Sequence, residues 1–207
     1  MTDQMQAIHD DLAYMKALAA EGKRTPLLGG AVGLAAGLIF GVASLVCWAI
    51  QRGIIAAPLM WQAWIWLGAF VLFMGALVVL VGRSHRKPGA SATTNRAVKA
   101  VWKGAGLAIF VLALGTIYLT SRFNTWLVWA AFCSIILALY GVCWTVSAAM
   151  SDRKWMWWIA YGSFAGSLGM ALMIGTGFEY LAYAIGLFLF AALPGWLMMR
   201  DEPSEIV

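Results

Sequence analysis

Six long apolar stretches dominate the sequence and limit the folds that are open to it. They lie near residues 27–50, 59–82, 101–120, 125–149, 155–175 and 178–199. Each is long enough to cross a bilayer as a helix, because about 20 helical residues span the apolar core of about 30 Å. No stretch shows the short polar–apolar alternation of a barrel strand. We therefore predict an all-α, polytopic membrane helix bundle with six transmembrane helices, arranged as three hairpins.

The composition agrees with membrane insertion. Of the 207 residues, 63% belong to the apolar and aromatic set and only 11% are charged, whereas soluble domains carry about 25% charged residues. A soluble fold of this size lacks the polar residues to cover its surface. The composition thus excludes a cytosolic enzyme, a secreted disulfide scaffold and a disordered regulator.

The basic residues are distributed unevenly between the two sides of the predicted bundle. Twelve of the 14 Lys and Arg residues fall on the side of the chain termini, which leaves Arg52 and Arg122 on the other side. Cytoplasmic loops carry such an excess, so we expect both termini to be cytoplasmic. Short loops and small size favour the inner membrane of a prokaryote. No basic stretch carries interleaved aromatic residues, so nucleic acid is not an expected partner.

Four segments follow from this topology. We expect a cytoplasmic amphipathic segment at 1–26, the helix bundle at 27–199 and a cytoplasmic tail at 200–207. Within the bundle, residues 83–100 are rich in basic residues, Gly, Ser and Thr, and predict a flexible cytoplasmic loop. The charges of this loop either attract anionic lipid head groups or only fix the orientation of the chain in the membrane, and the second interpretation is favoured.

The N-terminal segment carries a narrow apolar stripe. Met5, Ile8, Leu12 and Met15 recur at spacings of three and four, which predicts an amphipathic helix. Helices that bind anionic lipid are usually rich in Lys and Arg, but four acids and one Lys precede Gly22. The segment is therefore interpreted either as a docking helix for a protein partner or as a helix that packs under its own bundle or frays, and the second interpretation is slightly favoured.

Glycines recur every four residues in two of the spans. The expected helix-packing residues are Gly29, Gly33, Gly37, Gly41, Gly162 and Gly166. Rows of small residues let helix backbones approach closely in lipid. We expect both helices to be tightly packed, with contacts inside the chain favoured over contacts between chains. Pro194, inside the last span, should kink or end that helix.

Residues that carry chemistry are scarce. The apolar cores of the first five spans hold no Asp, Glu, Lys, Arg or His, which disfavours proton- or sodium-coupled transport. The two histidines, His9 and His85, fall outside the spans, and the three cysteines are better explained as buried free thiols than as a Cys47–Cys133 disulfide. We predict no catalytic residues, no metal site and no cofactor.

A set of three charged residues lies on the outer side of the predicted bundle. Arg52, Arg122 and Glu179 each lie in a short outer connection. They form either a site for an anionic ligand or a simple ion pair of Glu179 with one arginine, and the ion pair is favoured.

Together these features predict a non-enzymatic accessory or scaffold subunit of a larger membrane complex. Its partners would be membrane lipids and a membrane protein or a second copy of the chain. The alternative is a transporter or channel for an uncharged or lipid-like small molecule.

Overall fold

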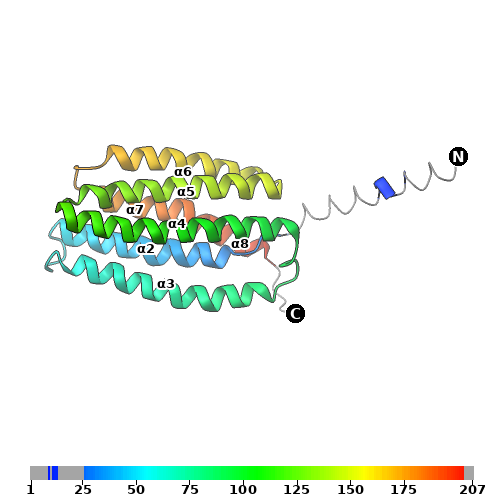
Figure 1. The fold of residues 1–207 in the computed structure, drawn as a ribbon, viewed down its shortest axis with the longest axis horizontal. Coiled ribbons are helices and arrows are strands. Elements are labelled where there is room, and N and C mark those ends of the chain that lie inside the picture. Colours follow the sequence, from blue (N-terminus) through cyan, green and yellow to red (C-terminus); the bar gives the residue numbers. More distant parts are fainter. Residues whose placement is uncertain (1–8, 10, 14–25, 203–207) are drawn as a thin grey trace.

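The computed structural model describes residues 9, 11–13 and 26–202, and Figure 1 shows these as a bundle of nearly parallel helices. The bundle comprises α2 (Gly30–Gln51), α3 (Trp61–His85), α4 (Thr93–Phe123), α5 (Leu127–Ser151), α6 (Lys154–Leu172), α7 (Glu179–Leu187), η1 (Phe188–Ala192) and α8 (Leu193–Asp201). The last three follow one another without a break and form one long helix that contains a π-helical turn. The described residues contain no β-strand, as the sequence predicts.

Two ends of the bundle differ in charge. The start of α2, the end of α8 and the α3–α4 and α5–α6 connections share one end (Figure 1), which we call the basic end. The basic residues in or next to these segments are Arg83, Arg86, Lys87, Arg96, Lys99, Lys103, Arg153, Lys154 and Arg200. The opposite end carries only Arg52 and Arg122 among the described Lys and Arg residues.

Five helices of the described part are long and apolar enough to cross a membrane. They are α2, α3, α4, α5 and the long helix from Glu179 to Asp201. The multi-span membrane character predicted from the sequence is therefore confirmed at this level. The 19-residue α6 lies outside this set, because Trp, Tyr, Gly and Ser dilute its aliphatic content.

The predicted loop at 83–100 is much shorter in the structure. Helix α3 continues to His85 and α4 begins at Thr93, so only residues 86–92 connect them. Asn95 fixes the start of α4: its amide nitrogen donates to the carbonyl oxygens of Pro26 (3.0 Å) and Gly89 (2.9 Å). Apolar stretches reveal membrane-crossing residues but not the amphipathic turns that extend a helix beyond them.

The core forms where α5 faces its neighbours. Helix α5 buries twelve residues, whereas Ala69 is the one buried residue of α3. In Figure 1, α3 and α6 occupy opposite edges of the bundle, and α2 lies between α3 and the remaining helices. The interior is thus shared by α2, α5 and the long C-terminal helix, with α3 at the periphery.

Helix α2 packs against η1 and α8 almost backbone to backbone. A Cβ atom on Gly37 would collide with the backbone of Ala192, and one on Gly41 would lie 2.7 Å from the Phe188 ring. A Cβ on Gly33 would lie 3.4 Å from the carbonyl oxygen of Ala191. This glycine face therefore points into the same chain.

Gly29 does not belong to this face, in contrast to the sequence-based expectation. It caps α2 with φ 113°, and a Cβ there would meet nothing within 4 Å. Gly30 occupies the packed position instead, where a Cβ would lie 2.5 Å from the carbonyl oxygen of Gly195. The four-residue period shifts by one because Gly29 adopts a left-handed conformation rather than a helical one.

Gly37→Leu should destabilise the protein by about 1–3 kcal/mol, because a side chain must enter space filled by the Ala192 backbone. The measurement is thermal unfolding of the purified protein in mild detergent. Gly115→Leu, on α4, is the matched control, since a Cβ there meets nothing within 4 Å. Equal stability of the two variants would contradict the close contact.

Candidate functional site

The long C-terminal helix contains a proline that it must accommodate in its interior. An α-helical N–H donates to the carbonyl four residues earlier, so Pro194 leaves the carbonyl oxygen of Phe190 without its usual donor. The helix does not end there, as one sequence-based alternative expected; it passes through the π turn of η1 and continues as α8.

Trp144 of α5 supplies the missing hydrogen bond. Its indole Nε1–H donates to the carbonyl oxygen of Phe190 at 2.8 Å, and its side chain is 3% exposed. The same indole ring meets Trp102 edge-on at 5.3 Å between centroids. A buried carbonyl without a partner is costly, so Trp144 allows a proline-containing turn inside the bundle.

Helices α5 and α6 are joined by a reciprocal pair of serines. The Ser134 hydroxyl donates to the carbonyl oxygen of Ser167 (2.7 Å), and the Ser167 hydroxyl donates to the carbonyl oxygen of Ser134 (2.8 Å). Nearby, Cβ atoms on Gly162 and Gly166 would each lie 2.7 Å from the Phe190 ring. The predicted glycine pair of α6 thus accommodates an aromatic ring of η1.

An aromatic cluster surrounds Trp66 towards the opposite end of the bundle. The Trp66 ring lies 5.7 Å from Trp129, 6.4 Å from Tyr180, 6.3 Å from Tyr183 and 6.2 Å from Phe40, measured between centroids. These rings come from α2, α3, α5 and α7. The cluster, which we call the Trp66 cluster, ties the peripheral helix α3 to the core.

Polar contacts border the Trp66 cluster. The Ser44 hydroxyl donates to the carbonyl oxygen of Tyr180 at 2.7 Å. The Tyr180 hydroxyl donates to Gln62 Oε1 at 3.2 Å, and Gln62 Nε2 reaches the carbonyl oxygen of Cys47 at 3.5 Å. These side chains link α2, α3 and α7 through direct contacts.

The three charged residues of the outer connections do not converge. Glu179 is 5% exposed, and its Oε1 accepts a hydrogen bond from the Gly175 N–H at 2.6 Å. The Arg52 guanidinium lies over the Phe178 ring, 4.7 Å from its centroid. Arg122 is exposed in the last turn of α4.

The expected ion pair of Glu179 with an arginine is therefore not formed among the described residues. The reason is local: Gly175 has a positive φ of 87°, which lets the α6–α7 connection turn its N–H towards the carboxylate. The first turn of a helix also favours a negative charge. Glu179 Oε2 has no hydrogen-bond partner in the described part of the chain.

A second polar assembly closes the basic end. Glu202 Oε1 accepts from the backbone N–H groups of Gly29 (3.0 Å) and Gly30 (2.8 Å), and Glu202 Oε2 pairs with Lys87 at 2.5 Å. The carboxylate satisfies N–H groups that the start of α2 would otherwise leave free. Its partners are 172 and 173 residues away in sequence.

The proposed docking stripe falls mostly outside the described residues. Met5, Ile8 and Met15 are not described, whereas Leu12 is helical with a 45% exposed side chain. Cys47, Cys133 and Cys143 are buried free thiols, as the sequence favours. The described residues contain no group of His, Cys, Asp and Glu side chains suited to a metal ion.

Sequence reasoning missed the residues that act across long separations. Trp144, Ser134, Asn95 and Glu202 make contacts that no local pattern indicates. One signal was present: a proline within a span requires an external donor for the freed carbonyl. Many candidate donors exist among the 12 Trp residues, so that signal does not single out Trp144.

Comparison with protein families, with curated proteins and with solved structures finds no match to this chain. The described part shows interlocking helix contacts that join α2, α5, α6 and the long C-terminal helix.

Removing the Trp144 donor should destabilise the bundle in a way that depends on Pro194. Trp144→Phe should cost about 1–3 kcal/mol beyond its packing effect, since the Phe190 carbonyl stays buried without a partner. In a Pro194→Ala background the new Ala N–H can take over, so the loss should be smaller. Thermal unfolding of the four proteins measures the coupling, and equal losses in both backgrounds would rule out this role of Trp144.

Proposed function

We propose that the chain is a six-span protein of a prokaryotic cytoplasmic membrane that acts as a non-enzymatic accessory or scaffold subunit. The multi-span membrane character is the starting point.

Connectivity supports a crossing by α6. Helix α5 ends at the basic end and α7 begins at the opposite end, so α6 has to run the length between them (Figure 1). It lies against α5 through the Ser134–Ser167 pair, and a Cβ on Gly141 would touch the Phe164 ring at 2.7 Å. A helix held along a membrane-spanning neighbour shares its depth in the bilayer.

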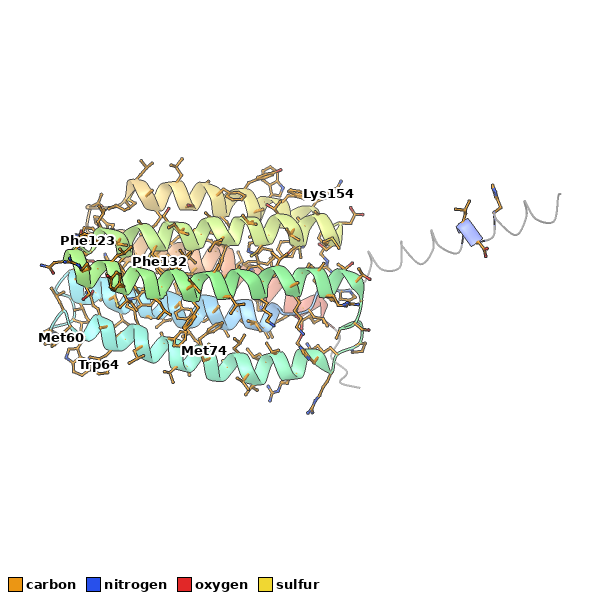
Figure 2. All side chains as sticks on the ribbon, in the orientation of Figure 1. Met60, Trp64, Met74, Phe123, Phe132 and Lys154 are labelled. Atoms are coloured by element: carbon orange, nitrogen blue, oxygen red, sulfur yellow. The ribbon has the colours of Figure 1, made fainter. Side chains whose placement is uncertain are left out.

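The two ends carry the side chains expected at two membrane surfaces. Figure 2 shows Met60, Trp64 and Phe123 at the opposite end and Lys154 at the basic end. Trp64 and Phe123 are 64% and 66% exposed. Aromatic side chains collect at head-group depth, and basic side chains collect on the cytoplasmic side, which supports a cytoplasmic basic end.

The observation that carries the scaffold role is the uneven burial of the helices. Helix α3 buries only Ala69, and Val71, Leu72 and Val78 are each more than 60% exposed. Helix α4 exposes Leu107, Val111 and Ile117 to a similar degree. Two long helices thus offer apolar faces to lipid or to other membrane helices, while the interior is bound together by the contacts described above.

A carrier for a small molecule is the second candidate. Buried polar atoms without a partner favour it: Trp48 Nε1 and Glu179 Oε2 are among those that make no hydrogen bond within the described residues. Polar groups of a ligand would satisfy such atoms. Mass analysis of protein purified in mild detergent separates the candidates, because a carrier retains a small molecule and a scaffold retains a protein.

Replacing Ile8 and Leu12 by Ser should release a protein partner without preventing membrane insertion. Each apolar side chain contributes about 1.5–3 kcal/mol when fully buried at a contact, so recovery of the partner should fall at least about tenfold. The measurement is quantitative pull-down from native membranes. Gln6→Ser with Asp11→Ser, off the stripe in the same segment, is the control, and equal recovery with both double variants would contradict the docking role.

A further inference from the structure

An open apolar groove runs along the outer face of α3. It is a shallow depression on this one helix, open to the surroundings, and it is lined by Val71, Leu72, Gly75, Ala76, Val79 and Leu80. Gly75 forms part of its floor, since a Cβ there would meet nothing within 4 Å. The lining contains no polar side chain.

The length and position of the groove match one leaflet of a bilayer. Residues 71–80 extend about 14 Å along the helix axis at 1.5 Å per residue, close to half of an apolar core of about 30 Å. Four of the six lining residues belong to the half of α3 nearer the basic end, and Val71 and Leu72 lie just before the midpoint, since α3 runs from Trp61 to His85. An acyl chain in the groove would therefore lie in the leaflet next to that end.

Cationic side chains continue the groove at the membrane surface. Arg83 follows Val79 by four residues and Leu80 by three, which places it on the same helix face. Arg86 caps α3 directly afterwards. Both arginines are exposed, and long arginine side chains reach from an apolar surface to the head-group region.

The nearby carboxylates are engaged elsewhere. Glu202 pairs with Lys87, and Asp201 pairs with Arg153. Within the described residues Arg83 and Arg86 make no ion pair. An apolar groove of one-leaflet length thus ends at two cations without a carboxylate partner, a combination that complements a lipid with an anionic head group.

We infer that α3 binds one anionic phospholipid, with an acyl chain in the groove and the phosphate at Arg83 and Arg86. Diffuse attraction of anionic lipid to a basic protein surface would involve the basic residues of α4 equally. A bound lipid instead depends on both the arginines of α3 and the open groove. This inference rests on the membrane location and is independent of the scaffold role.

The full chain is reconstituted in phosphatidylcholine bilayers that contain a phosphatidylglycerol probe spin-labelled on one acyl chain. Electron paramagnetic resonance then measures the motionally restricted probe, and a labelled phosphatidylcholine gives the reference. Each basic residue is worth about a fivefold change in lipid association, so Arg83→Gln with Arg86→Gln should lower the preference for the anionic probe on the order of 25-fold. The variant Arg96→Gln with Lys103→Gln removes the same charge from α4 and should retain most of the preference for the anionic probe. Equal losses in the two variants would overturn the inference.

Glycine variants test the groove separately from the charges. Gly75→Leu fills the groove without meeting protein atoms, and it should lower the preference for the anionic probe. Gly68→Leu, also open but outside the groove on the same helix, should not. Native mass spectrometry of the same proteins counts bound phosphatidylglycerol. An unchanged preference for the anionic probe in Gly75→Leu, or conversion of a protein dimer to monomer by that variant, would contradict lipid occupancy.

Discussion

In an apolar environment every backbone N–H and C=O group needs a hydrogen-bond partner, and the long C-terminal helix shows how this protein meets that demand. Pro194 removes one donor, and the Trp144 indole replaces it at the Phe190 carbonyl. Because the same π turn faces α2, the turn also shapes the packing of the first helix. Gly37 approaches Ala192 at backbone distance there, so a proline, a tryptophan and a glycine from three helices depend on one another.

The contact between Gly37 and Ala192 also brings the two ends of the described chain together. The first and last described helices lie side by side, with Gly30, Gly33, Gly37 and Gly41 providing the close approach. Ser44 then bonds to the Tyr180 carbonyl near one end, and polar groups of the chain close the other end. Dispersion contacts and interhelical hydrogen bonds, rather than a hydrophobic driving force, hold helices together in lipid. The interior contacts are therefore made by α2, α5 and the C-terminal helix, and much of the exposed apolar surface belongs to α3 and α4.

Much of the fold was predictable because membrane thickness imposes a length on each span. The glycine period of α2 was also visible, since close packing needs small residues at fixed spacing. The exact packing face of α2 was not predictable from the sequence, because the left-handed conformation of Gly29 moves the contact to Gly30. The extended start of α4 depends on Asn95, and the end of α2 depends on Glu202, and neither has a local sequence signal. For the candidate site, sequence placed Glu179 and Arg52 in outer connections but not their actual partners, Gly175 and Phe178, because backbone turns decide those contacts.

The central claim is that the chain crosses the membrane six times with its basic end on the inner side, and topology reporters fused within the chain test it most directly. Fusions after Gly89, Asp152, Gly175 and Val207 should report inside, inside, outside and inside. The fusions at Gly175 and Val207 decide the role of α6, because parity changes if it does not cross. A signal inside at Gly175 together with a signal outside at Val207 would show five crossings and contradict the account. An outside signal at Gly89 would contradict the predicted orientation.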